Sequence, residues 1–143
     1  SHIAIAKRTN KALIIHDRDA HEDILRVLRE EGAPEKVIFH CYSGDAEMAS
    51  ECVRAGYFLS FSGTVTFKNA PALREALQRT PLENLLVETD APFLAPAPYR
   101  GALNSSAQIA RTIRFMAEVM EKPVEELCDA TRENALSLFG DFS

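Results

Sequence analysis

Histidine and carboxylate side chains stand directly after three short apolar runs of this sequence. His16 and His40 each follow one run, and Glu88 and Asp90 follow a third. Imidazole and carboxylate are the ligands expected for zinc, manganese or magnesium in a hydrolytic site. Functional residues of α/β folds collect just past the carboxyl ends of the strands, so these groups are expected to converge there. The pattern therefore predicts a divalent-metal site.

Each of these residues also has a purely structural interpretation. A single histidine at a strand end is more often a hydrogen-bonded structural residue than a ligand. Two histidines at equivalent positions, His16 and His40, favour metal binding more strongly, and Asp90 at the same height adds to this. Arg18 can reach a phosphate with two N–H groups. An ion pair between Arg18 and a neighbouring aspartate is an equal alternative.

Other polar side chains nearby are assigned no chemistry. His21 falls in the first turn of an expected helix and is interpreted as a solvated residue. Cys41 has no base arranged around it and is interpreted as a small buried side chain. Arg111 and Arg114 are interpreted as a solvated helix face. Arg100 lies in a proline-rich loop after the last apolar run, which either lines a substrate groove or caps the fold.

The elements that must position these groups alternate between short apolar runs and helical patterns. Each run is apolar on both faces, as in parallel strands covered by helices; the runs are 12–15, 37–39, 58–61 and 85–87. The strand ends recur every 21 to 27 residues, which is the length of a βα unit with a right-handed crossover. Four such units form half of a TIM barrel, and a small open α/β sheet is the alternative.

Residue types at the helix ends predict where the helices begin and stop. One helix is expected to begin at Asp19, where Glu22 gives a capping-box spacing, and another at Asp45. A third begins near residue 69, with a proline in its first turn. Ser105 or Ser106 is expected to cap a later helix. Further helices are expected over 2–10, from 123 as a short element, and around 135–139.

Composition narrows the class of protein. The 143 residues suit one domain, 1–143, and 46% hydrophobic with 26% charged residues argues against disorder. No apolar run approaches the roughly 18 residues of a membrane helix, and the first residues do not resemble a signal peptide. Three scattered cysteines indicate neither a disulfide scaffold nor a zinc motif. These features predict a cytoplasmic protein without membrane contact. A net charge of −5 argues against binding nucleic acid through broad electrostatics alone.

Four motifs resemble the TatD family of metal-dependent deoxyribonucleases, which are amidohydrolase-like TIM-barrel hydrolases. The motifs are HDRDAH at 16–21, VIFHCYSG at 37–44, FLSFSGTVTFKNA at 58–70 and LLVETDAPFLAP at 85–96. The resemblance implies an α/β fold, a parallel (βα)4 half of a TIM barrel with extra C-terminal helices. It also implies a metal-dependent phosphodiester hydrolase acting on DNA, in the manner of a 3′–5′ exonuclease. Alternatives are another ester or amide hydrolase on the same scaffold, or a non-catalytic half that needs a partner chain.

The resemblance implies a role for each candidate residue. His16 and His40 look like the two histidines that bind one metal ion. Asp90 looks like a metal ligand that also orients or deprotonates the attacking water, and Glu88 looks like the acidic residue that supports the site or touches substrate. Arg18 would contact a phosphate. The complete enzyme would hold one or two ions of magnesium, manganese or zinc.

The sequence departs from the family's pattern in three places. The His-x-His pair of the first barrel strand and the glutamate of the fourth strand are absent, because the chain begins just before what would be the fifth strand. Residues 104–106 read Asn-Ser-Ser, where the family often has Asn-Glu-Pro. A half barrel has free strand edges at 12–16 and 85–88. Free edges invite pairing, so self-association or pairing with the missing N-terminal half is expected.

Overall fold

Four parallel strands form one sheet in the computed structural model, which describes residues 1–140. The strands follow one another in the sheet in chain order; they are β1 (Leu13–His16), β2 (Val37–His40), β3 (Phe58–Phe61) and β4 (Leu85–Val87). Each coincides within one residue with an apolar run of the sequence, so the predicted strands are confirmed. Short runs that are apolar on both faces form strands here because helices bury them.

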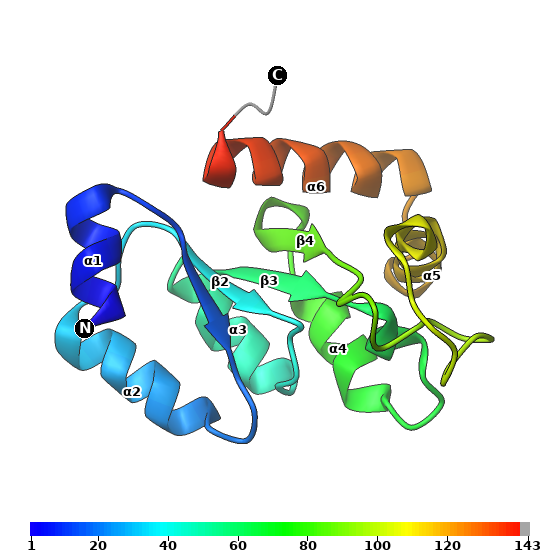
Figure 1. Cartoon of the computed structure of the whole chain (residues 1–143), viewed down its shortest axis with the longest axis horizontal. Helices are drawn as coiled ribbons and strands as arrows, with labels where there is room; N and C mark the ends of the chain where they lie inside the picture. The colour runs from blue at the N-terminus through cyan, green and yellow to red at the C-terminus, as the bar shows by residue number, and fades with distance from the viewer. Residues whose placement is uncertain (141–143) are drawn as a thin grey trace.

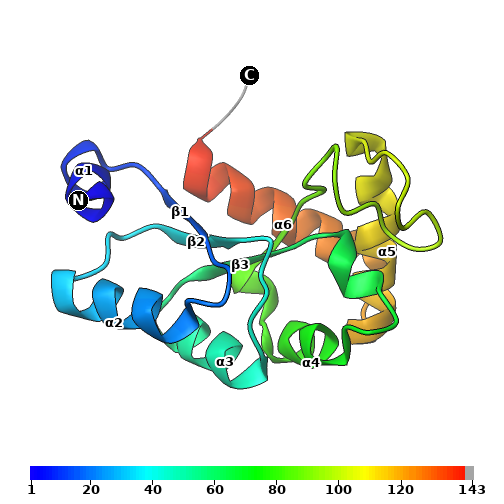
Figure 2. The same ribbon diagram turned by 60° about the horizontal axis from the view of Figure 1, so that its bottom comes forward.

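Helices cover the sheet from both sides (Figure 1). The helices that connect the strands line one face; they are α2 (His21–Glu31), α3 (Ala46–Arg54) and α4 (Pro71–Arg79). On the other side of the sheet α6 (Val124–Phe139) passes β4, as Figure 2 also shows. The remaining helices are α1 (His2–Thr9), α5 (Ile109–Met120) and three short 3-10 turns, Gly63–Thr66, Leu82–Asn84 and Ser106–Gln108.

Strand register aligns the candidate site residues. His16 of β1 lies opposite His40 of β2, and Phe61 of β3 lies opposite Val87 of β4. All four strands run in one direction, so the segments that follow them leave the sheet at the same edge. This edge is where His16, His40 and Glu88 stand, as the strand pattern predicts.

The two faces of the sheet are buried to different degrees. Phe39, Leu59 and Leu85 point into a large core shared with the connecting helices and are at most 1% exposed. On the opposite face a smaller cluster joins Ile38 and Leu86 to α6, while Ile14 of β1 stays 56% exposed. The apolar surface of β1 is therefore only partly covered.

The start of α2 differs from the sequence prediction. The helix begins at His21, and Asp19 is in a left-handed conformation with φ of 59° instead of serving as the cap. Asp17 organises the turn instead, because its Oδ1 accepts a hydrogen bond from the Ala20 N–H at 3.1 Å. The predicted cap at Asp45 is confirmed, since its carboxylate accepts a hydrogen bond from the Met48 N–H.

Two predictions for the C-terminal helices are wrong. Residues 124–139 form one 16-residue helix instead of two short ones. The sequence suggested a break because the polar Thr131, which is buried in α6, interrupts the apolar pattern. Thr131 is satisfied there by donating to the Leu127 carbonyl. Neither Ser105 nor Ser106 caps α5, which follows a 3-10 turn and begins at Ile109. Across residues 1–140 no helix combines the length and the apolar composition that a membrane span requires.

The free edge of β1 makes self-association a testable prediction. Within residues 1–140, β1 pairs only with β2 and β4 only with β3. We expect the chain to associate through β1, where Ile14 is exposed, because an unpaired apolar edge recruits another strand. Sedimentation velocity across a concentration series measures this, and Ile14→Lys is expected to shift the chain toward monomer. A wild-type chain that stays monomeric throughout the series contradicts the prediction.

The three cysteines are free, and their burial predicts unequal reactivity. Burial raises the pKa of the Cys52 thiol from 9.0 to about 12, which lowers its thiolate fraction at pH 8 about a thousandfold. Cys128 is exposed. We expect iodoacetamide at pH 8 to modify Cys128 quickly and Cys52 only after unfolding. Mass spectrometry of the labelled chain measures this, with Cys128→Ser as control. Rapid labelling of Cys52 in the folded chain is the contrary result.

Candidate metal centre

Three potential ligands converge at the carboxyl edge of the sheet. His40 ends β2, and Glu88 and Asp90 follow β4; each offers one ligand atom, and these atoms lie within 4.8 Å of one another. Nδ1 of His40 lies 2.8 Å from Oε1 of Glu88, and Nε2 lies 3.4 Å from Oδ1 of Asp90. Each of the two ring nitrogens of His40 therefore has a carboxylate oxygen beside it. The group is partly open, since the three side chains are between 18% and 32% exposed.

The polar atoms of this group fit a divalent cation. Oε1 of Glu88 is buried and has no hydrogen-bond partner among the described residues, because the nearby His40 nitrogen lies outside hydrogen-bond geometry. A buried carboxylate oxygen without a partner is costly unless another group satisfies it. Two ligands of a tetrahedral ion at about 2.0–2.1 Å stand about 3.4 Å apart, which matches the His40–Asp90 separation. One imidazole and two carboxylates suit zinc, manganese and magnesium.

Strained backbone holds these ligands in place. Cys41 and Asp90 have φ of 45° and 55°, in the left-handed region that non-glycine residues seldom adopt. The conformation of Cys41 aims its N–H at Oε2 of Glu88, at 3.0 Å. This contact fixes one carboxylate oxygen and leaves the other for a ligand. Such conformations cost on the order of 1–2 kcal/mol each and tend to occur at functional sites.

The structure places the remaining predicted site residues around this group. His16 lies beside His40, with ring centroids 6.1 Å apart, but outside the group of three. Its role as a ligand stays a prediction, and so does the expected supporting role of Glu88, whose Oε1 lies 2.8 Å from Nδ1 of His40. Arg18 is exposed and makes no ion pair within residues 1–140, and its role as a phosphate contact stays a prediction.

His21 is not the solvated residue that the sequence suggested. Its Nδ1 is paired with Oδ2 of Asp17, and its side chain is 34% exposed. The physical reason is the turn before α2, in which the Asp17 carboxylate accepts from the Ala20 N–H and also reaches His21, the first helical residue. His21 therefore closes the α2 turn and lies apart from the metal group.

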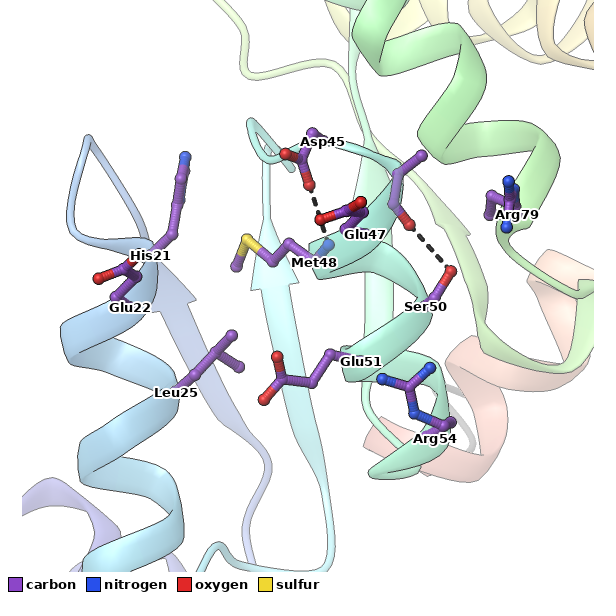
Figure 3. Close-up of a pocket in the computed structure, with 11 residues that line it drawn as sticks. His21, Glu22, Leu25, Asp45, Glu47, Met48, Ser50, Glu51, Arg54 and Arg79 are labelled. Atoms are coloured by element: carbon purple, nitrogen blue, oxygen red, sulfur yellow. Dashed lines mark hydrogen bonds between the residues drawn. The ribbon is translucent and has the colours of Figure 1, made fainter.

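A groove of about 670 Å³ lies between α2 and α3 (Figure 3). It is lined by His21, Glu22 and Leu25 from α2 and by several acidic residues of the α3 region, with Arg79 across from them. Two of its four acidic side chains have structural partners: Asp45 caps α3, and Glu51 pairs with Arg29. None of the three candidate ligands lines this groove, so its volume does not mark the reactive site.

Sequence reasoning assigned no role to Asn104, although it anchors the loop beside the metal group. Its side chain is buried, and Nδ2 donates to the carbonyl of Thr89 at 2.6 Å and to that of Phe93 at 2.7 Å. Its Oδ1 accepts from the Ser105 N–H at 2.9 Å. The amide thereby joins the strand end to the loop. A lone Asn in a polar loop carries no pattern from which this contact could be predicted.

Comparison with known proteins decides the family. A family model described as TatD related DNase matches residues 1–140. The chain belongs to the TatD family. An uncharacterized metal-dependent hydrolase TatD of Mycobacterium tuberculosis is 52% identical over 139 residues, which cover 97% of this chain and 53% of that relative. The YabD metal-dependent hydrolase of Bacillus subtilis is 47% identical and covered to 54%.

A solved TatD structure agrees with this assignment. The crystal structure of YJJV, a TatD homolog from Escherichia coli K12, matches with a TM-score of 0.91 and 30% identity, over 97% of this chain and 54% of that one. The chain spans about half the length of the curated TatD relatives it matches. The predicted resemblance and the predicted (βα)4 half-barrel architecture are both confirmed.

Metal binding to this TatD chain is expected to stabilise it. An ion at a hundred times its Kd adds about 2.7 kcal/mol to the unfolding free energy, provided that it binds only the folded state. Thermal unfolding with Mn²⁺, Zn²⁺ or Mg²⁺ against EDTA measures this. His40→Ala is expected to remove most of the shift, because His40 contacts both carboxylates. His2→Ala, exposed on α1, is the matched control. An unchanged shift in His40→Ala would place the metal elsewhere.

Proposed function

We propose that this protein is a metal-dependent phosphodiester hydrolase that removes nucleotides from the 3′ ends of DNA. The observation that carries the proposal is the group of His40, Glu88 and Asp90, with its unsatisfied buried oxygen, in a chain of the TatD family. The relatives are named metal-dependent hydrolases, and the matching family model is described as TatD related DNase. The cytoplasmic location expected from the sequence stays a prediction.

In this proposal the three residues have different tasks. Asp90 is 31% exposed, so its carboxylate can meet an incoming water and accept its proton. Glu88 is more buried and is held by the Cys41 N–H, so it fixes the orientation of His40 and of the site. A divalent cation held by these groups would lower the pKa of the attacking water and offset the negative charge that develops on the phosphate.

The bond changes follow from the substrate. The water oxygen forms a bond to phosphorus, the bond from phosphorus to the 3′ oxygen breaks, and that oxygen takes a proton from solvent. Asp90 accepts the proton that the water loses. Arg18 is exposed on the segment that follows β1, and in this proposal its guanidinium would bind a phosphate oxygen with two N–H donors.

The test is nucleotide release from 3′-labelled single-stranded DNA with Mg²⁺ or Mn²⁺. Release that EDTA stops and that a 3′ phosphorothioate end blocks is the expected result. RNA of the same sequence and small esters or amides run in parallel, because the fold alone does not determine the substrate. Turnover of the small esters without DNA cleavage would favour the other hydrolase class. A folded chain without turnover on any substrate would contradict the proposal and favour a half that needs a partner chain.

A further inference from the structure

Two long segments of this acidic chain contain no acidic residue, and one of them begins directly after the candidate ligand Asp90. Two segments, 57–74 and 91–117, contain five of its 16 lysines and arginines and none of its 21 acidic residues. The remaining residues are correspondingly more acidic than the net charge of −5 indicates. We call the surface formed by these two segments the basic shelf. Its charge is opposite to that of a polyanion and differs from that of the rest of the molecule.

The two segments are joined to each other. The Ala97 N–H donates to Oγ1 of Thr66 at 2.8 Å. Gly63 lies so close to the second segment that a Cβ there would stand 2.5 Å from the carbonyl oxygen of Leu94. The Arg100 guanidinium lies 4.3 Å over the ring of Phe67 and donates to Asn69 at 3.3 Å. The basic shelf is therefore one continuous surface.

Two exposed arginines of the basic shelf, Arg100 and Arg111, lie over aromatic rings rather than beside carboxylates. The Arg111 guanidinium lies 4.8 Å over the ring of Tyr99, and its Nη2 donates to the Tyr99 hydroxyl at 3.4 Å. Within residues 1–140 neither Arg100, Arg111 nor Arg114 makes an ion pair, and Arg114 is likewise exposed. A stacked guanidinium is oriented and keeps most of its N–H groups available for phosphate.

Aromatic and apolar side chains on the same loop face solvent. Phe93 is 69% exposed, Tyr99 43% and Leu103 84%. The loop that carries them is tied down, because the Phe93 N–H donates to the Asp90 carbonyl at 2.9 Å and the buried Asn104 binds both ends of the turn. Phe93 thus stands three residues from a candidate metal ligand. A ring exposed on an anchored loop beside a reactive site is suited to stack on a ligand.

We propose that the basic shelf binds a single-stranded nucleic acid, with unpaired bases stacked on Phe93 and Tyr99 and phosphates held by Arg100 and Arg111. Single strands are bound by positively charged surfaces that carry aromatic stacking platforms. An acidic peptide would match the charge but would leave the rings without a partner. A duplex would match the charge but would keep its bases inside the helix. This inference rests on the proposed function in one respect only, which is that the 3′ end of the bound strand lies at His40.

The first experiment measures binding without turnover. Fluorescence anisotropy of a labelled single-stranded oligonucleotide, with the full 143-residue chain in EDTA, separates binding from hydrolysis. Phe93→Ala and Tyr99→Ala are each expected to weaken binding at least about fivefold, the lower bound for one stacked base. Phe139→Ala is the matched control, since Phe139 is 45% exposed at the end of α6, distant from the 91–104 loop in Figure 1.

The second experiment measures the phosphate contacts. Arg111→Gln is expected to weaken binding and to reduce the slope of log K against log salt by about 0.7, the value for one contact with a single strand. Arg111→Lys keeps the charge and loses the planar stack, so it is expected to preserve the slope. Arg8→Gln, on α1 at the opposite end of the molecule in Figure 1, is the control.

Several results would overturn the proposal that the basic shelf binds single-stranded nucleic acid. These are equal binding of a duplex or of polyglutamate, unchanged affinity in Phe93→Ala, and equal losses in the control variants. Hydrolysis that continues normally in all shelf variants would also reject the basic shelf and leave the proposed function standing. Binding that falls as expected in a chain without hydrolytic activity would support the basic shelf and reject the proposed function.

Discussion

Asp90→Asn is expected to lower metal-dependent DNA hydrolysis by about 10²–10⁴-fold, the usual contribution of a positioned proton acceptor. Asparagine keeps the shape of the side chain but neither carries charge nor accepts a proton from water. Asp90 lies 3.4 Å from His40 and is 31% exposed, so it is both near the expected ion and open to substrate. The loss is therefore expected in the rate of the bound complex and in the affinity for metal.

Initial rates at saturating Mn²⁺ measure the effect of Asp90→Asn, with circular dichroism to show that the chain is folded. Asp129→Asn is the matched control, because Asp129 is exposed on α6 and belongs to no cluster of candidate ligands. Raising the metal concentration separates the two effects, since a rate that recovers fully reports lost affinity alone. Wild-type rates for Asp90→Asn at ordinary metal concentration would remove Asp90 from the site.

Phe39→Ala is expected to lower the free energy of unfolding by about 3–5 kcal/mol, the usual cost of emptying a buried aromatic position. Phe39 is 1% exposed in β2, and its ring packs against that of Tyr57 at 6.1 Å between centroids. The cavity would lie one residue from His40, so the variant tests whether the core supports the site. A domain of this kind is stable by only about 5–15 kcal/mol.

Urea unfolding followed by circular dichroism measures the change caused by Phe39→Ala. Phe93→Ala removes the same number of atoms from an exposed position, so its unfolding free energy is expected to change by no more than about 0.5 kcal/mol. Equal effects of the two variants would mean that β2 does not lie in the core. A larger metal requirement in Phe39→Ala would show that the packing of β2 positions His40.

Residue type and spacing were enough to predict the strands and the polar groups that follow them. Residues 37–39 and 85–87, like the other two runs, are apolar on both faces, as parallel strands covered by helices are. His40 and Asp90 were predicted as site residues because the carboxyl ends of parallel strands share one edge. These are local properties, readable from residue type and spacing, and the structure places both residues in the same group.

Local sequence patterns gave wrong helix boundaries where a side-chain hydrogen bond sets the boundary. The start of α2 depends on Asp17, whose carboxylate reaches Ala20 and His21 across a turn. The helix α6 continues through Thr131 because the Thr131 hydroxyl donates to the Leu127 carbonyl of the same helix. This bond allows a polar residue to be buried where the pattern predicts an apolar one. Side-chain hydrogen bonds of this kind compete with intrinsic preference and leave little trace in residue type.

The arrangement of the site depends on contacts that exist only in the folded chain. β3 lies between β2 and β4, so the order of the sheet does not place His40 beside Glu88. Their side chains meet because the left-handed Cys41 aims its N–H at Glu88 and the left-handed Asp90 turns the chain back toward His40. The stacking of Arg100 and Arg111 joins segments far apart in the sequence in the same way. Spacing along the chain carries no information on such contacts, because they depend on the packing of the whole sheet.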